Sequence, residues 1–485
     1  MFDIITAVDN DFGIGKNNDI PWKLPSDFKY FRDTTLHSYI IMGHNTWKSL
    51  PKKPLPNRTN IIISSTNNLQ IDSPQFIVKY NSDKIICCEH TILYVFRSLD
   101  NALTCINHSK CDNRKNTFVI GGEQLYIEAI NHPNCDKIYL TKIYKKYDCD
   151  KFFPQIPQNF RLFTLSKFNN ENDTYFRYYV YAKLHTTRMY SSYYHNYEEE
   201  AYTSLLRRIV NYGEKKKNRT GIPTLSLFSE QLKYDLSDTF PILTTRRQYL
   251  RGIFEELLFY LRGDTNNNHL VEKGVNVWTK NTTKEFLESR NLDYAVGDMG
   301  PTYGFNFRHF GGMYRGCDWN YECGVDQLSE LIHTLRTEPD SRRMIITLWD
   351  PKNNKVSALP SCMCFYQFHT SENNSKLNLQ VYIRSSDFFL ANNWNTCTAA
   401  IFVHLLCNLE GINMTPGILS VVMGDVHVYT NQLEAINSCL DRVPKPFPKL
   451  VVKSEKKKCI TDFSFEDIFL VGYEADKRVK VDMAV

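Results

Sequence analysis

The sequence predicts two mixed domains in series, an N-terminal α/β sheet domain followed by a C-terminal α+β domain. First, the chain has 485 residues, whereas a single domain mostly runs to about 200 residues. Second, residues 1–184 alternate short strand-like runs with helical patterns, which is typical of an α/β sheet. Third, residues 197–485 mix long helices with strands. The hydrophobic content of 42% and the aromatic content of 13% are those of a globular chain.

The elements of the first domain are predicted from the period of their apolar residues. A buried strand is a short β-branched run bounded by turn residues, and a helix has a longer period. These signals predict strands at residues 4–8, 39–42, 60–63 and 117–120. They predict intervening helices at residues 43–50 and 123–129. Residues 175–184 alternate as a closing antiparallel strand does.

Residues 185–196 are rich in Thr, Ser and Tyr and have no apolar period, so we interpret them as a short junction. An amphipathic helix is predicted to begin near Glu198, because four apolar side chains share one face: Leu205, Leu206, Ile209 and Val210. Further patterns predict helices at 253–261 and 399–409 and strands at 344–349 and 377–383. We therefore place the domains at residues 1–184 and 197–485.

Composition excludes several classes of protein. No stretch approaches about 18 uninterrupted apolar residues, so no membrane span is expected. The chain starts with an early acid, Asp3, and lacks the basic and apolar regions of a signal peptide. The 14 cysteines are scattered, and many lie in apolar runs, which favours reduced, buried thiols over a secreted disulfide scaffold. Reduced thiols predict a cytoplasmic protein. No second Cys pair or His pair has zinc-like spacing, so we expect no metal site.

The net charge of +5 is small, but basic residues occur in clusters such as Arg246-Arg247, Arg342-Arg343 and Lys456-Lys457-Lys458. Each cluster alone is best explained as solvated surface. Together they favour anionic partners, either small phosphorylated molecules or nucleic acid.

Two features of the first domain indicate a ligand site. Asp27 has the aromatic neighbours Phe28 and Phe31, and a carboxylate among apolar residues has a raised pKa and can deliver a proton. The alternative is a helix cap, since Ser-Asp is common at a helix start. Gly121-Gly122 ends a strand and opens a helix, which lets N–H groups face a phosphate, although a glycine pair alone is weak evidence.

Five motifs occur in order in the first domain. They are Gly13-Ile14-Gly15-Lys16-Asn17-Asn18-Asp19-Ile20-Pro21-Trp22, Ile41-Met42-Gly43-His44-Asn45-Thr46-Trp47, Leu55-Pro56-Asn57-Arg58-Thr59-Asn60, Val119-Ile120-Gly121-Gly122 and Tyr139-Leu140-Thr141. Through these motifs the domain resembles the dihydrofolate reductases. The resemblance covers residues 1–184. It implies reduction of dihydrofolate, with NADPH as the cofactor that supplies hydride.

This resemblance also implies residue roles. Asp27 would be catalytic, holding the pterin and governing protonation at its N5. The folate pocket would consist of Ile5, Ala7, Trp22, Phe28, Phe31, Leu50, Arg58 and Thr141, with Arg58 on the folate α-carboxylate and Trp22 acting through a water. Ordinary core packing is the alternative for Phe28, Phe31 and Leu50. NADPH would contact Gly15, His44, Thr46, Ser64, Ser65, Ile120, Gly121, Gly122 and Tyr126. The family usually has a basic residue in place of His44, and often in place of Ser65.

The second domain offers two candidate nucleophiles, Cys362 and Cys364. The thiolate, and not the thiol, is the nucleophilic form of cysteine, and nearby cations favour the thiolate. Two residues apart in a strand, the two cysteines would share one face, so the residues alone do not choose between them.

A second set of motifs follows from residue 197 onward. They are Asn218-Arg219-Thr220-Gly221, Phe240-Pro241-Ile242-Leu243-Thr244-Thr245, Glu256-Leu257-Leu258, Gly263-Asp264-Thr265-Asn266, Gly300-Pro301-Thr302-Tyr303-Gly304, Asp340-Ser341-Arg342-Arg343, Pro360-Ser361-Cys362, Arg384-Ser385-Ser386-Asp387 and Gly424-Asp425-Val426-His427-Val428-Tyr429. With these motifs the second domain resembles the thymidylate synthases. The resemblance implies methylation of dUMP by 5,10-methylenetetrahydrofolate, which leaves dihydrofolate.

The synthase resemblance selects Cys362 as the nucleophile that attacks C6 of dUMP. Glu256 would organise water for proton transfers, and Tyr303 would assist loss of the C5 proton. Arg384 would lower the pKa of Cys362 and bind phosphate. The remaining binding residues would be Arg219, Ser385, Asn395, His427, Tyr429, the pterin ligand Asp387 and, across a dimer interface, Arg342 and Arg343.

Some positions depart from the synthase pattern while the catalytic positions are retained, so activity is expected. Ser361 replaces a proline, Met363 replaces a histidine, and Ile383 replaces a glutamine. Ala391-Asn392-Asn393-Trp394 replaces a Gly-aliphatic-Pro-Phe run.

The order of reductase before synthase resembles the fused enzyme of protists and predicts a homodimer through the synthase domain. The first domain would consume the dihydrofolate that the second produces. One alternative is an active reductase that carries a non-catalytic synthase-like dimerisation scaffold. The other is a chiefly RNA-binding protein, but no stacking-aromatic motif of an RNA module is present, so nucleic acid is not required.

Overall fold

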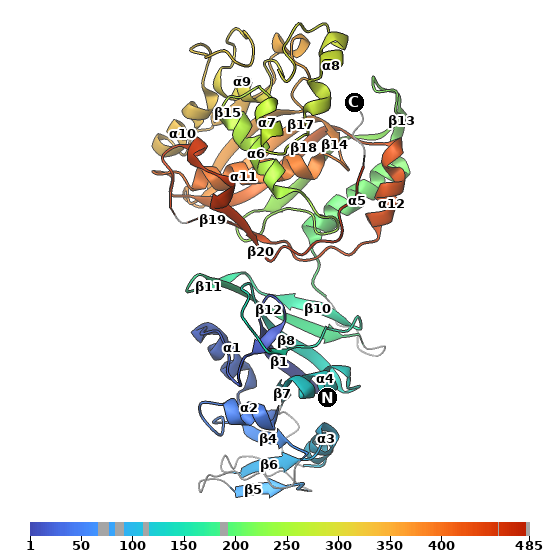
Figure 1. Ribbon diagram of the computed structural model, residues 1–485, viewed down its shortest axis with the longest axis vertical. Helices are drawn as coiled ribbons and strands as arrows, with labels where there is room; N and C mark the ends of the chain where they lie inside the picture. Colours follow the sequence, from blue (N-terminus) through green and yellow to red (C-terminus); the bar gives the residue numbers. More distant parts are fainter. Residues whose placement is uncertain (66–76, 83–91, 110–115, 185–192, 454, 482–485) are drawn as a thin grey trace. The chain divides into compact units, whose positions relative to one another are not determined.

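The computed structural model describes residues 1–65, 77–82, 92–109, 116–184, 193–453 and 455–481. They form two compact units, Met1–Tyr194 and His195–Val485 (Figure 1). Residues 185–192 of the predicted junction lie outside the described residues. No described helix is long and apolar enough to cross a membrane.

The first unit is a mixed sheet with helices on both faces. Its strands are β1 (Phe2–Val8), β2 (Gly13–Gly15), β3 (Tyr39–Gly43), β4 (Thr59–Ile63), β5 (Ile77–Tyr80), β6 (Ile92–Phe96), β7 (Thr117–Gly121), β8 (Cys135–Ile143), β9 (Lys151–Phe152), β10 (Phe160–Leu165), β11 (Asn169–Glu171) and β12 (Thr174–Lys183). Its helices are α1 (Pro25–Thr35), α2 (His44–Ser49), α3 (Leu99–His108) and α4 (Glu123–Asn131).

The strand order is β10-β12-β8-β1-β7-β3-β4-β6-β5, with β11 paired to β12. Pairing is parallel from β8 across to β5, whereas β12 is antiparallel to both β8 and β10. Ile40 and Ile41 show why β3 is apolar throughout: Ile41 packs with α3 and α4, and Ile40 packs with Trp47 of α2 on the other face. The predicted α/β sheet with an antiparallel closing strand is confirmed.

The second unit combines a sheet with larger helices. Its strands are β13 (Glu214–Lys216), β14 (Thr224–Asp235), β15 (Ile345–Thr347), β16 (Met363–Ser371), β17 (Lys376–Asp387), β18 (Thr415–Tyr429), β19 (Lys449–Val452) and β20 (Ile468–Val471). Its helices are α5 (Tyr197–Tyr212), α6 (Leu250–Leu261), α7 (Asn268–Glu272), α8 (Lys284–Ser289), α9 (Tyr303–Arg308), α10 (Gln327–Thr337), α11 (Asn392–Cys407) and α12 (Leu433–Leu440).

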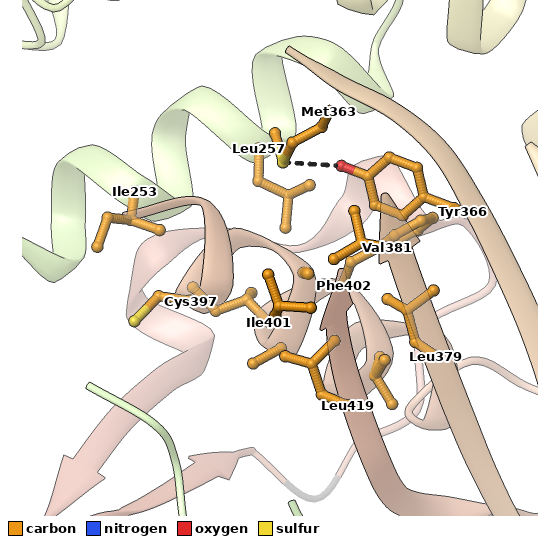
Figure 2. Close-up of a cluster of buried hydrophobic side chains, with 14 of the residues drawn as sticks. Ile253, Leu257, Met363, Tyr366, Leu379, Val381, Cys397, Ile401, Phe402 and Leu419 are labelled. Carbon is orange, nitrogen blue, oxygen red and sulfur yellow. Dashed lines mark hydrogen bonds between the residues drawn. The ribbon is translucent and has the colours of Figure 1, made fainter. Parts of the chain in front are cut away.

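The main sheet of this unit has the order β13-β14-β18-β17-β16-β15, with β17 and β18 parallel and the other neighbours antiparallel. Helices α6 and α11 pack on one face through side chains such as Leu257 and Ile401, which meet Val381 of β17 (Figure 2). Met363 also lies in this core, where its sulfur accepts a hydrogen bond from the Tyr366 hydroxyl at 3.2 Å (Figure 2). The α+β prediction is confirmed.

Several boundaries differ from the prediction. Helix α6 begins at Leu250 rather than Ile253, and β17 extends to Asp387 rather than Ile383. Helix α11 begins at Asn392 rather than Ala399, because polar side chains hide its first turns from an apolar pattern. The Asn393 side chain donates to the Pro241 carbonyl at 2.8 Å and accepts from the Leu243 N–H at 3.2 Å, so it is satisfied inside the protein. The strand predicted at 344–349 is shorter, and Arg342 and Arg343 lie in the turn before β15.

Candidate active sites

Asp27 lies in the first turn of α1 and is 7% exposed. The N-cap of α1 is Leu24, so Asp27 is not the helix cap. Burial raises the pKa of Asp27 to about 6, a hydrogen bond from Thr141 on β8 opposes that shift, and the charge of Glu171 adds to it. A carboxyl group with this pKa can hold or release a proton near neutral pH.

Five of the predicted folate-lining residues belong to two apolar clusters of the first unit. Ile5, Phe31 and Leu50 belong to one cluster, and Ala7 and Trp22 belong to another. The buried indole N–H of Trp22 has no hydrogen-bond partner among the described residues. Because buried donors are normally satisfied, this group is suited to a water or a ligand atom.

Phe28 is 46% exposed, which excludes core packing as its role. Arg58 is buried, and its side chain donates to the Thr35 hydroxyl and to the Pro56 carbonyl, both at 3.0 Å. Burial lowers the pKa of Arg58, and Arg32 adds to this effect. A guanidinium has five N–H donors, so these two bonds orient Arg58 and leave donors for a carboxylate.

Most of the predicted cofactor residues lie at the carboxyl ends of the neighbouring strands β4, β3 and β7. They are His44, Thr46, Ser64, Ser65, Gly121 and Gly122. A Cβ added to Gly121 would lie 2.6 Å from Cγ2 of Thr46, and Gly122 has a φ of 101°, so both positions require glycine. Backbone N–H groups at such strand ends favour phosphates, and the residues present fit a phosphorylated dinucleotide.

Burial lowers the pKa of His44, and Lys48 adds to this effect, so the His44 imidazole is mostly neutral at pH 7. Of the other predicted cofactor residues, Ile120 directly precedes Gly121 in β7. The other two lie on separate elements. The Gly15 carbonyl of β2 accepts from the Asp150 N–H at 3.0 Å. Tyr126 of α4 is buried, and its hydroxyl donates to the Ile5 carbonyl at 3.0 Å.

Cys362 and Cys364 differ in their surroundings. Cys362 stands just before β16 and is partly exposed, whereas Cys364 is buried and its thiol donates to the carbonyls of Ser361 and Cys362, both at 3.4 Å. The pairing of β16 with β17 shifts register between Met363 and Phe365. This irregularity breaks the alternation that would place the two cysteines on one face. Cys362 is therefore the accessible candidate.

Arg384 of β17 lies against Cys362, with its Nη2 3.8 Å from the sulfur. Its side chain also donates to the carbonyls of Pro360 and Ser361, both at 2.9 Å, which ties it to the segment before the cysteine. Burial raises the pKa of Cys362. The charge of Arg384, a hydrogen bond with Tyr303 and the charge of Arg219 each lower it. Arg384 contributes in the predicted direction, but burial outweighs it and the net direction is upward.

Glu256 is buried on α6 and is surrounded by hydrogen-bond donors. Its Oε1 accepts from the Trp278 indole at 2.8 Å, and its Oε2 accepts from the Trp394 indole at 2.6 Å. Tyr260 is a further side-chain partner. These three residues were not predicted, and Trp278 and Trp394 give no local signal because they are remote from Glu256 in the chain.

Tyr303 connects Glu256 to the nucleophile. Its ring stacks on that of Tyr260 with centroids 4.7 Å apart, and its hydroxyl accepts from the Cys362 N–H at 2.7 Å. Burial raises the pKa of Tyr303 well above its ordinary value, so the phenol stays protonated.

The predicted substrate residues Ser385 and Asp387 on β17 pair with Asp425 and His427 on β18. Nδ1 of His427 lies 2.7 Å from Oδ1 of Asp425, and its ring lies 5.3 Å from that of Tyr429. The Asp387 carboxylate accepts from the Leu390 N–H at 3.0 Å and from the Gln432 amide at 2.9 Å. Gln432 was not predicted, and neither was Asp425 as the partner of His427, although their i, i+2 spacing in a strand was an available signal.

The remaining predicted substrate residues have fewer contacts with neighbouring side chains. Within the part of the chain that the structure describes, the side chain of Asn395, in the first turn of α11, makes no hydrogen bond. Arg219 is exposed and acts electrostatically on Cys362 and Tyr429. Arg342 and Arg343 are exposed, and among the described residues neither guanidinium has a hydrogen bond or an ion pair.

Known families match both units. Residues 1–183 match the family model for dihydrofolate reductase, and residues 200–485 match that for thymidylate synthase. A bifunctional dihydrofolate reductase-thymidylate synthase of Paramecium tetraurelia is 35% identical, with 100% of this chain and 99% of that protein covered. The bifunctional proteins of Leishmania major and Arabidopsis thaliana (number 2) are each 33% identical over 100% of this chain and over 95% and 88% of their own lengths.

Proposed function

The chain belongs to the family of bifunctional dihydrofolate reductase–thymidylate synthases, and from this premise we propose how its two sites act. The synthase domain methylates dUMP to dTMP with 5,10-methylenetetrahydrofolate, and the reductase domain reduces the resulting dihydrofolate with NADPH. The observation that carries the proposal is that one chain holds both a buried acid, Asp27, and a thiol beside a cation, Cys362 with Arg384.

In the reductase domain, NADPH supplies the hydride when it is bound. Asp27 in its protonated form holds the pterin and governs protonation at N5, with Thr141 orienting the carboxyl group. The unpaired indole N–H of Trp22 supports this role through a water. Arg58, already oriented by Thr35, pairs with the folate α-carboxylate.

In the synthase domain, the sulfur of Cys362 bonds to C6 of dUMP, and this bond breaks again when dTMP leaves. Arg384 stabilises the thiolate and the substrate phosphate. Tyr303 assists loss of the C5 proton, and Glu256 organises the water that moves protons. Asn395 contacts the pyrimidine, and His427 and Tyr429 hold the ribose hydroxyl.

A coupled assay tests the whole proposal. With dUMP, methylenetetrahydrofolate and NADPH present, we expect dTMP to form and NADPH to be oxidised, and omission of dUMP should stop both. A scaffold-type synthase domain would instead oxidise NADPH with added dihydrofolate but form no dTMP. The retained geometry of Cys362, Arg384 and Tyr303 favours the active synthase.

We further propose a homodimer through the synthase sheet, in which Arg342 and Arg343 of one subunit reach the phosphate site of the other. The face of the sheet opposite α6 and α11 carries exposed or half-exposed side chains, namely Ile345, Phe365, Gln367 and Tyr382. A face of this kind suits a two-fold interface, in which the same surface of both copies is used.

Subunit mixing tests this arrangement. Inactive Cys362→Ala protein is mixed and reassembled with protein carrying Arg342→Ala and Arg343→Ala. Activity should rise toward about a quarter of wild type, because half of the dimers are mixed and each of those has one intact site. Mixing Cys362→Ala with Arg219→Ala is the matched control, since Arg219 acts on Cys362 of its own chain, and it should restore nothing. Failure to recover activity despite proven subunit exchange would show that Arg342 and Arg343 act in their own subunit.

We propose residues 1–184 and 197–485 as the two catalytic domains and a cytoplasmic location for the enzyme. The described cysteines are free thiols, many of them buried, which suits a reducing compartment.

A further inference from the structure

Trp394 is one of the positions at which the synthase domain departs from its family, and here the departure adds a hydrogen-bond donor. Synthases usually have phenylalanine at this place, and phenylalanine has no N–H to donate. Here the indole of Trp394, in the first turn of α11, donates to Oε2 of the buried Glu256 on α6 at 2.6 Å. This distance is shorter than that of an ordinary N–H···O hydrogen bond, as expected when the acceptor is a carboxylate.

We propose that Trp394 is a positioning residue for the synthase reaction, which holds the Glu256 carboxylate in one orientation as a hydrogen-bond acceptor. The inference rests on the proposed synthase activity. Trp278 binds Oε1 and Trp394 binds Oε2, so each carboxylate oxygen has its own indole donor from a different part of the chain. With Tyr260 as a third partner, donors on both oxygens restrict rotation of the carboxylate, and Trp394 is the indole donor on Oε2.

Helix α6 is adapted to this indole. Gly252 lies one turn before Glu256, and a Cβ added there would lie 2.8 Å from Cη2 of Trp394. The same Cβ would lie 2.7 Å from Cε1 of Tyr249. The glycine therefore leaves space for two rings, that of Tyr249 and that of Trp394 beside Glu256.

The electrostatic surroundings agree with this geometry. Burial raises the pKa of Glu256, and the hydrogen bond from Trp394 is the largest influence against that rise, ahead of those from Tyr260 and Trp278. The titratable groups that face Glu256 are the phenols Tyr260 of α6, Tyr303 of α9 and Tyr366 of β16. Burial raises the pKa of each phenol above its ordinary value, so they remain neutral between pH 5 and 8 and do not contribute a step there.

The test is the pH dependence of dTMP formation by full-length Trp394→Phe protein. Loss of the Trp394 donor raises the pKa of Glu256. As the pH is lowered, Glu256 therefore becomes protonated, and activity is lost, at a higher pH than in the wild-type protein. We expect the acidic limb of the kcat profile to move upward by about one pH unit and kcat at pH 7 to fall several-fold. The KM for dUMP should change little, because Trp394 acts through Glu256.

Two controls separate this effect from packing. Trp319→Phe makes the same chemical change at an exposed position and should leave the profile unmoved. Site-specific replacement of Trp394 by a tryptophan analogue with sulfur in place of the indole N–H keeps the ring size, so it tests the donor even if the phenylalanine variant folds poorly. An unshifted acidic limb in the analogue protein, with active wild type in the same assay, overturns the inference. Wild-type protein that forms no dTMP would instead overturn the proposed function.

Discussion

Replacing Cys362 with alanine is expected to remove dTMP formation, with a loss of more than about 1,000-fold in kcat, because no other group can form the covalent bond to C6. Dihydrofolate reduction by the same protein should stay at the wild-type rate, since the first unit is a separate compact body. The measurement is dTMP formation and NADPH oxidation, each assayed with its own substrate.

Cys364→Ala is the matched control, two residues away. This thiol is buried and bonded to backbone carbonyls, so its loss should cost about 1 kcal/mol of unfolding free energy through a small cavity and leave the chemistry in place. Trapping the enzyme with 5-fluoro-dUMP and mapping the modified peptide identifies the nucleophile directly. Modification of Cys364 would contradict the assignment.

The second large effect is expected at Asp27. Asp27→Asn should lower dihydrofolate reduction at pH 7 by about 100-fold or more, because an amide cannot supply the proton that the pterin needs. Synthesis of dTMP, assayed separately, should be unchanged. Retention of more than about a tenth of the reductase activity would reject the role of Asp27.

The reductase rate should also depend on pH through the protonation of Asp27. The pKa of Asp27 is raised to about 6, so the protonated carboxyl is present below that pH and is lost as the pH rises through it. The wild-type rate should therefore fall above about pH 6, and the Asp27→Asn rate should lack this step. Thr141→Val serves as a control, because removing the hydrogen bond that lowers the pKa of Asp27 should move the same step to higher pH.

Local pattern was sufficient for much of the fold. Strands β1, β3, β4 and β7 are apolar runs whose residues are buried on both faces, and this property is written in consecutive residues. Helix α1 was not predicted, because few of its side chains are buried and it has little apolar period. Asparagines in the first turn concealed the start of α11, since their burial depends on partners at Pro241 and Leu243.

The two families, their order and most of the candidate residues could be predicted without a structure, because each motif is a contiguous run of residues. At other residues the sequence left two interpretations open, and the folded chain distinguishes between them. Asp27 is a buried acid and not a cap, because α1 begins at Pro25 with Leu24 as its N-cap. Cys362 differs from Cys364 because a register shift in β16 breaks the strand alternation. The pairing of Trp278 and Trp394 on Glu256 joins residues remote in the chain, and the energy of such contacts depends on distance in space, which no local pattern encodes.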